Sequence, residues 1–165
     1  MSKNDPWLDL SLEALPPAGA DRVRVFRLLV LEGARLRGLL DKALAPSGIT
    51  AQQGALLSWI QAQAAPPTLS EVAAGLRMTH QNVKQIALAL QRKGFVDIQV
   101  DTADRRARRL VLTRLHHRFW RERNPDDFAA VQDWMAVWND AEVRRVLLLL
   151  RRMHRHLDAR GGDAP

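Results

Sequence analysis

The 165-residue chain contains no cysteine. Disulfide bonds, zinc ribbons, nucleophilic thiols and thiol-based oxidation sensing are therefore excluded. Its longest apolar runs, at 26–31 and 146–150, are too short to span a bilayer. The first fifteen residues show no signal-peptide pattern, and the sequence carries no internal repeat. These absences predict a cytoplasmic protein that does not bind a membrane.

Motifs typical of enzymes are also missing. The sequence has no phosphate-binding loop, no Gly-x-Ser-x-Gly and no His-Glu-x-x-His. Histidines occur side by side at 116–117 and two residues apart at 154 and 156, spacings that do not place two imidazoles on one helical face. We therefore expect no catalytic residues, no metal site and no cofactor.

The composition favours a folded domain with a polyanionic partner. Hydrophobic residues make up 47% of the chain, which is enough for a core, and the formal net charge is +7. Lysine and arginine release condensed counterions when they neutralise phosphates, so this charge is typical of nucleic-acid binding. An Arg-rich composition also arises from genome bias and suits acidic membrane surfaces, so charge alone does not decide the function.

The first half of the chain predicts an irregular arm followed by short and long helices. Residues 1–20 are interrupted by proline and glycine, with a turn of helix near 8–15. Asp21 is expected to cap a helix that runs to Leu44. Thr50 and Gln53 fit a capping box for a helix over 51–64, and Ser70 is expected to cap a short helix over 71–76. Thr68 and Leu69 fit a very short strand.

The second half adds a helix, a hairpin and two more helices. Thr79 is expected to cap a helix that runs to Arg92. Alternating apolar residues predict strands at 95–100 and 108–113 around a polar turn. Helical patterns follow at 114–123, interrupted by Asn124–Pro125 and continuing to 137, and at about 140–159 after a capping box at 139–142. A tight helix pair followed by a hairpin is typical of a winged helix-turn-helix.

The resulting prediction is a mainly α fold with a small β-hairpin, in which long N- and C-terminal helices mediate dimerisation. The expected division is an N-terminal arm (1–20), dimerisation helices (21–47 and 114–160), a winged helix-turn-helix DNA-binding domain (48–113) and a disordered tail (161–165). Several leucines widen the apolar surface of the first long helix beyond one stripe. A helix that is apolar on more than one face must be covered on both, and this is a hint of dimerisation.

The helix after Thr79 has the pattern of a DNA-recognition helix. Its apolar residues recur with helical spacing on one face, and its polar residues gather near the N-terminus, where such a helix meets base edges. Amide side chains can bond adenine, and lysine can reach guanine or phosphate. The DNA-contacting residues expected here are Thr79, His80, Gln81, Asn82, Lys84 and Gln85. The alternative is an ordinary amphipathic helix whose polar side faces water.

The hairpin turn at 101–107 is strongly basic. It places Arg105 and Arg106 at the tip and Arg108 at the start of the returning strand, where arginine can enter the negative minor groove. Asp104 is expected to pair with a neighbouring arginine or to cap the turn. The alternative is a solvated charged turn.

These segments resemble the MarR family of bacterial transcription regulators. The resemblance rests on Leu69-Ser-Glu-Val-Ala-Ala, Met78-Thr-His-Gln-Asn-Val-Lys-Gln-Ile, Leu90-Gln-Arg-Lys-Gly-Phe-Val, Asp101-Thr-Ala-Asp-Arg-Arg-Ala and Leu110-Val-Leu-Thr113. It spans roughly 21–159, and the wing motif is its most specific part. Gln85 occupies a position where the family often has arginine. Pro125 is expected to kink what is usually one long helix, which places the shape of the dimer interface in question.

The resemblance implies a homodimer in which the first and last helices of the two subunits interlock. Such a dimer binds a pseudo-palindromic operator in double-stranded DNA. Many members repress transcription until a small aromatic or phenolic ligand releases them. Arg35, Trp59 and Trp120 are candidate ligand-binding residues, although tryptophan is also an ordinary core residue. The function expected is a repressor of this kind. The alternative is a winged-helix module for architectural DNA binding or protein interaction without ligand control.

Overall fold

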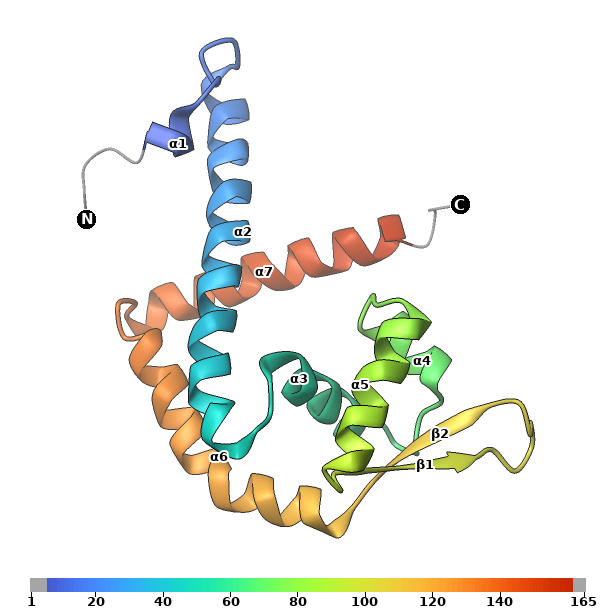
Figure 1. Ribbon diagram of the computed structural model, residues 1–165. Helices are drawn as coiled ribbons and strands as arrows, with labels where there is room; N and C mark the ends of the chain where they lie inside the picture. The colour runs from blue at the N-terminus through green and yellow to red at the C-terminus, as the bar shows by residue number, and fades with distance from the viewer. Residues whose placement is uncertain (1–5, 162–165) are drawn as a thin grey trace. The chain divides into compact units, whose positions relative to one another are not determined.

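The computed structural model describes residues 6–161, and the tail predicted as disordered lies, apart from Gly161, outside the described residues. The chain divides into two compact units between His117 and Arg118. The first unit holds helices α1 to α5 and a hairpin, and the second holds most of α6 and all of α7 (Figure 1). The predicted mainly helical fold with one small hairpin is confirmed.

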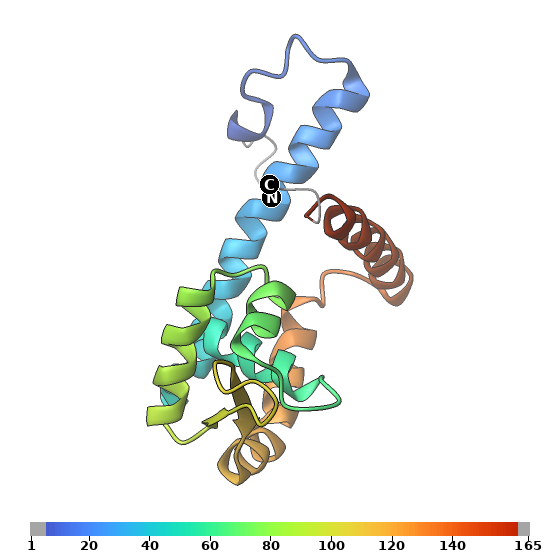
Figure 2. The same ribbon diagram turned by 90° about the vertical axis from the view of Figure 1, so that its right-hand side faces the viewer.

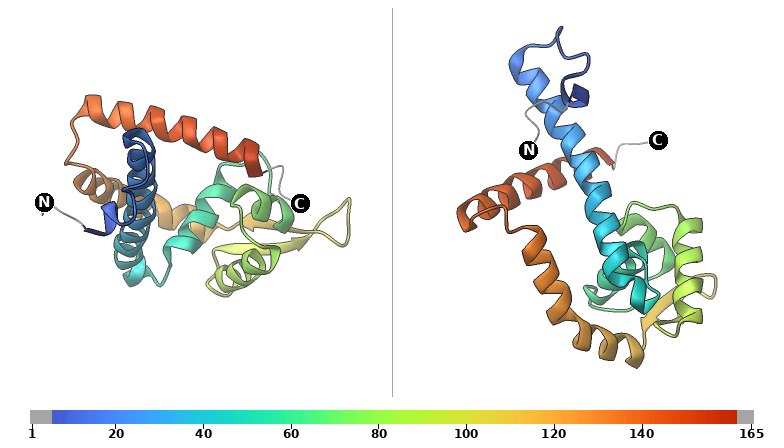
Figure 3. Two further views of the ribbon diagram at one scale, coloured as in Figure 1. Left: turned by 90° about the horizontal axis from the view of Figure 1, so that it is seen from above. Right: turned by 60° about the vertical axis from the view of Figure 1, so that its left-hand side comes forward.

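The N-terminal arm forms a short helix that folds back on a long one. Helix α1 spans Pro6–Asp9 and lies beside the N-terminal part of α2, which spans Pro17–Leu44 (Figure 3). Arg27 of α2 donates hydrogen bonds to the carbonyl oxygens of Trp7 at 3.0 Å and Leu8 at 2.8 Å. This guanidinium therefore satisfies carbonyls that the short helix leaves unpaired.

The start predicted for the long helix at Asp21 is wrong, because α2 begins four residues earlier. Its first residue is Pro17, and proline is well suited to the first helical position because its N–H would be unpaired there anyway. Asp21 is an internal residue, and its carboxylate forms an ion pair with Arg24 at 2.9 Å. The proline pair therefore starts this helix instead of preceding it.

A short 3-10 turn joins the long helix to the next three helices. The turn is Ala45–Ser47, and the helices are α3 Ala51–Gln61, α4 Leu69–Gly75 and α5 His80–Arg92. The capping box predicted at Thr50 and Gln53 is confirmed. The cap predicted at Ser70 is wrong: Thr68 caps α4, with Glu71 completing a second capping box. The sequence Thr-Leu-Ser-Glu has the Thr-x-x-Glu spacing that this motif requires.

The two strands form an antiparallel hairpin. Strand β1 spans Val96–Val100 and β2 spans Arg108–Leu112, with Val96 opposite Leu112 and Val100 opposite Arg108. The short strand predicted around Thr68 is reduced to a single bridge between Thr68 and Arg109. This bridge attaches the hairpin to the segment that leads into α4.

The core of the first unit lies between α3, α4, α5 and the hairpin (Figures 1 and 2). Apolar side chains from each of these elements are completely buried there, among them Leu56, Leu57, Val72, Val83, Leu90, Val96 and Leu110. Gly94 follows α5 with a φ of 77°, and Phe95 N–H then donates to the Leu90 carbonyl at 3.0 Å. This left-handed glycine turns the chain sharply from α5 into β1.

The C-terminal helices are α6, Arg114–Trp134, and α7, Asp140–Gly161. The break predicted at Asn124–Pro125 is wrong, because Pro125 lies inside one continuous helix, but this helix bends along its length (Figures 1 and 3). A proline in a helix interior removes one backbone donor and its ring clashes with the preceding turn, so it can bend a helix without ending it. The capping box predicted at Asn139 and Glu142 is confirmed: Glu142 N–H donates to Asn139 Oδ1 at 3.1 Å, and Asn139 N–H donates to Glu142 Oε2 at 2.9 Å.

Candidate nucleic-acid interface

Helix α5 buries one face and exposes the other. Thr79 is its N-cap, as predicted, and its hydroxyl accepts a hydrogen bond from Asn82 N–H at 3.2 Å. The buried face is formed by Val83, Ile86, Ala87 and Leu90. This apolar stripe fixes how α5 is rotated about its own axis, so its polar side chains must face away from the core.

The polar residues predicted to contact DNA lie on the outer face of α5. Five of the six are exposed: Thr79, His80, Gln81, Lys84 and Gln85; Asn82 is half-buried. They occupy the N-cap and first two turns, where unpaired backbone N–H groups and the helix dipole also favour an anion. This end of α5 therefore presents amide, imidazole and ammonium groups beside a positive helix terminus.

The turn of the hairpin is organised by Asp101, which is almost fully buried. Its carboxylate accepts hydrogen bonds from Ala103 N–H at 2.7 Å and Asp104 N–H at 2.8 Å, and it is paired with the guanidinium of Arg109. These interactions lower the pKa of Asp101, the two backbone N–H groups first and the arginine after them. The side chain therefore remains an anion that holds the turn closed.

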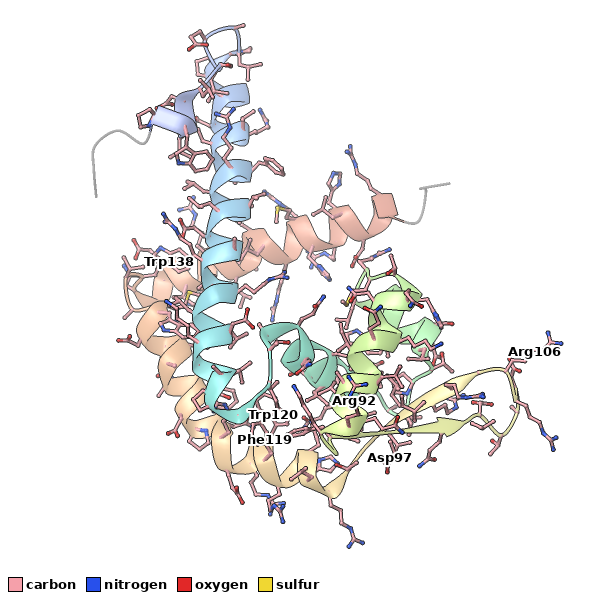
Figure 4. The ribbon with its side chains drawn as sticks, in the orientation of Figure 1. Arg92, Asp97, Arg106, Phe119, Trp120 and Trp138 are labelled. Carbon is pink, nitrogen blue, oxygen red and sulfur yellow. The ribbon has the colours of Figure 1, made fainter. Side chains whose placement is uncertain are left out.

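Arginines extend from this closed turn into solvent. Arg105, Arg106 and Arg108 are all exposed, and Arg106 points away from the end of the hairpin (Figure 4). Arg108 donates to the carbonyl oxygens of Arg105 at 2.9 Å and Ala107 at 3.1 Å, so it also supports the turn. Asp104 accepts a hydrogen bond from Arg106 N–H at 2.9 Å. Of the two roles predicted for Asp104, the one seen here is capping of the turn.

A groove of about 710 Å³ separates the start of α5 from the hairpin. His80 and Lys84 line it from α5, while Arg106 and Arg108 line it from the hairpin. Four of the predicted DNA-binding residues thus meet around one basic concavity. Thr79, Gln81, Asn82, Gln85 and Arg105 are not among its lining residues.

The other eight lining residues of this groove were not among the predicted DNA contacts, and they include Ser70, Asp101 and Arg109. Arg109 joins the hairpin to the helices, because its Nη1 donates to the Pro66 carbonyl at 2.6 Å while its Nε donates to Asp101. The sequence signal was an aspartate and an arginine that flank a polar turn. That spacing shows an ion pair only once the register of the hairpin is known.

The three candidate ligand-binding residues come from three different helices. Arg35 lies on α2 and forms an ion pair with Glu32 at 2.9 Å. Trp59 lines a cavity beside the α3–α4 connection, which Arg35 does not line. Trp120 belongs to the second unit, where its ring meets that of Phe119 edge-on with centroids 5.2 Å apart. Both rings are labelled in Figure 4.

No helix between residues 6 and 161 is long and apolar enough to cross a membrane. Over the same range, histidine and carboxylate side chains form no group of three or more that could hold a metal ion.

The interface described above coincides with a known family pattern. Residues 47–107 match the model of the MarR family. The winged helix-turn-helix of this chain is of the MarR type. The match covers α3 to α5, β1 and the turn of the wing, and it includes every lining residue of the groove except Arg108 and Arg109. No curated protein sequence matches the chain.

Solved MarR-family structures share this fold over most of the chain. A MarR protein from Peptoclostridium difficile has 17% identity and a TM-score of 0.75, covering 82% of this chain and 88% of its own. The DNA complex of Staphylococcus aureus MepR has 22% identity and a TM-score of 0.71, covering 79% and 96%. CouR from Rhodococcus jostii bound to p-coumaroyl-CoA has 22% identity and a TM-score of 0.67, covering 78% and 90%. At these identities the likeness is one of fold.

Proposed function

We propose that this protein is a homodimeric, sequence-specific DNA-binding transcriptional regulator of the bacterial cytoplasm, and that it represses transcription until a small molecule releases it. The observation that carries the proposal is the groove between α5 and the wing. Lys84 of the recognition helix lines one side, and Arg106 and Arg108 of the hairpin line the other. A concavity with basic residues on both sides can hold one phosphate backbone, which carries negative charge. The helix and the hairpin would then lie in the two grooves that flank this backbone.

In this docking model the first turns of α5 enter the major groove and the wing reaches an adjacent minor groove. Gln81 and Gln85 would read base edges, while Lys84 would bond phosphate or guanine. Arg106 would insert where the minor-groove potential is most negative. MepR, which has a similar fold, has been solved in complex with DNA, and this supports the model.

Dimerisation is supported by apolar side chains that each unit leaves exposed. In the first unit, α2 exposes Val25, Phe26, Leu29 and Val30. In the second, α7 exposes Val143, Leu147, Leu150, Met153 and Leu157, which recur at helical spacing. Contiguous exposed apolar patches of this kind usually mark an interface with another chain. A second copy would cover them, so light scattering should give twice the 18.6 kDa chain mass.

Selection of genomic fragments by the purified protein tests the DNA-binding proposal. The bound fragments should share one pseudo-palindromic sequence upstream of a small set of genes. Scrambled duplexes of equal length and composition serve as the control. Tight binding to every fragment alike would favour an architectural role, and no binding at physiological salt would refute the proposal.

A further inference from the structure

A cavity of about 470 Å³ lies beside the connection between α3 and α4, and it shares one lining residue, Arg109, with the basic groove. Its walls are mostly apolar, formed by Trp59, two prolines and three alanines, and they include one carboxylate, Glu71, and one guanidinium, Arg109. A volume of this size, with apolar walls and few charged groups, is typical of small-molecule sites.

The indole of Trp59 packs against Gly75, in the space that any other side chain at that position would fill. A Cβ atom built on Gly75 would lie 2.1 Å from Cζ2 of the indole, so any larger residue would displace the ring. At the same helix end, the Gln63 side chain donates to the Trp59 carbonyl at 2.9 Å. The aromatic wall of the cavity is therefore formed before any ligand binds.

The charged groups of the cavity favour a cation. Glu71 accepts hydrogen bonds at Oε2 from Thr68 N–H at 2.6 Å and from the Thr68 hydroxyl at 2.9 Å, and these interactions lower its pKa. Glu71 thus carries a full negative charge at neutral pH. Arg109 forms an ion pair with Asp101 and also attracts the carboxylate of Glu71, so two carboxylates share one guanidinium. One negative charge remains beside an indole, and a ring face and a carboxylate together attract an organic cation.

We propose that this cavity binds a small organic cation with a flat apolar body, through the indole of Trp59 and the carboxylate of Glu71, and that Arg109 transmits its occupancy to the wing. This inference rests on the proposed function, since it specifies how a ligand would release DNA.

Arg109 belongs both to the cavity wall and to the base of the wing. Its Nη1 donates to the carbonyl of Pro66, another residue of the cavity, and its Nε donates to Asp101. Asp101 in turn accepts hydrogen bonds from two backbone N–H groups of the wing turn. A cation bound beside Glu71 repels the guanidinium, which weakens this chain of contacts. Occupancy of the cavity therefore loosens the arginine-bearing turn and lowers DNA affinity.

The binding step is tested on the full-length protein without DNA. Benzylamine, benzyl alcohol and benzoate carry the same ring with a positive, zero and negative charge. Each is titrated while the indole N–H resonances of the five tryptophans are followed by NMR, with Trp59 assigned through Trp59→Phe. Benzylamine should shift the Trp59 resonance at millimolar concentration, and benzoate should not. An unmoved Trp59 resonance, or equal shifts with all three probes, would overturn the proposal.

A matched pair of variants separates charge from helix capping. Glu71→Gln keeps an oxygen that can accept from Thr68 N–H, so the capping box survives without the charge. It should weaken benzylamine binding about tenfold. Glu142→Gln makes the same change in the capping box of α7, in the other unit, and should leave binding unchanged. Equal affinity of the wild-type protein and the Glu71→Gln variant would refute the role of this carboxylate.

The coupling step is measured separately, on a fragment obtained by genomic selection. Benzylamine should lower the affinity of the wild-type protein for that fragment and leave the affinity of Glu71→Gln unchanged. If Trp59 responds to benzylamine but DNA affinity does not change, the site stands and the transmission through Arg109 is refuted. If the protein selects no DNA at all, the proposed function fails, while the NMR titration still decides whether the cavity binds cations.

Discussion

The ammonium group of Lys93, just after the last residue of α5, lies 2.8 Å from the side-chain oxygen of Gln53 at the start of α3. It also donates to the carbonyl of Gly48, in the turn before α3. On the other side of that turn, Ala51 N–H donates to the carboxylate of Asp41, on α2, at 2.6 Å. The start of α3 is thus joined to the long helix on one side and to the recognition helix on the other.

Replacing Lys93 by methionine should destabilise the protein by about 1 kcal/mol, because it removes hydrogen bonds from a charged donor at an exposed site. Urea unfolding measures the change in the free energy of unfolding. Lys42→Met removes the same charge from an exposed lysine of α2 and should have almost no effect. Equal losses in both variants would show that the Lys93 contacts contribute nothing specific.

Gln85 is exposed on the second turn of α5 and is expected to read a base edge. In Gln85→Ala, binding to the preferred sequence should weaken by about 1–3 kcal/mol, and specificity should relax at one or two base positions. Competition binding against single-base variants of the selected sequence measures both effects. Gln91→Ala, near the C-terminal end of the same helix, is the control. An unchanged base preference in Gln85→Ala would refute the docking of α5.

Arg106 at the end of the wing is expected to interact with DNA through its charge. In Arg106→Ala, affinity should fall on many DNA sequences alike. The magnitude of the slope of log affinity against log salt concentration should decrease by about one for this one lost phosphate contact. Arg92→Ala removes an equal charge from the C-terminal end of α5 and should leave the slope nearly unchanged. If the two variants behave identically, the wing makes no specific contact.

Asp101 is predicted to be required for the shape of the wing turn. In Asp101→Ala, the N–H groups of Ala103 and Asp104 lose their acceptor and Arg109 loses its ionic partner. Amide hydrogen exchange should accelerate at both positions, and DNA affinity should fall although no DNA-contacting side chain has changed. The same substitution at Asp97, which is exposed on β1, is the control and should alter neither measurement.

Local signals in the sequence were enough to predict α5 and the hairpin. Thr79 was recognisable as a cap, and the apolar spacing after it determined which face of α5 is buried. The same kind of signal misplaced the starts of α2 and α4. Pro17 was placed in the irregular arm although proline suits a first helical position. Thr68 was placed in a short strand and Ser70 at the cap, although Thr68 is the residue with glutamate three positions later.

Contacts between distant segments could not be predicted in the same way. The bonds from Arg109 to Asp101 and to Pro66 depend on the register of the hairpin and on how it packs against the α3–α4 connection. Likewise, the place of Trp59 against Gly75 depends on the packing of α4 on α3. Spacing along one element says nothing about such pairs, and they are the contacts that link the cavity to the wing.

His116, in the first turn of α6, is completely buried. Burial first, and the neighbouring His117 second, lower its pKa to about 4. The ordinary value of 6.5 applies to the unfolded chain, so between these two values only the unfolded state binds the proton. The stability that neutral His116 provides is therefore complete above pH 6.5 and is lost as the pH falls toward 4.

Since each pKa unit corresponds to about 1.4 kcal/mol, lowering the pH from about 7.5 to about 5 should cost roughly 2 kcal/mol of unfolding free energy through this residue. Urea unfolding at both pH values measures the total change. His116→Leu removes the ionisable group from the buried position and should reduce the pH dependence by that amount, whatever it does to stability at neutral pH. His117→Gln, at the exposed neighbour, should retain most of the dependence. If His116→Leu loses stability with pH as steeply as the wild-type protein, His116 is not the group that titrates.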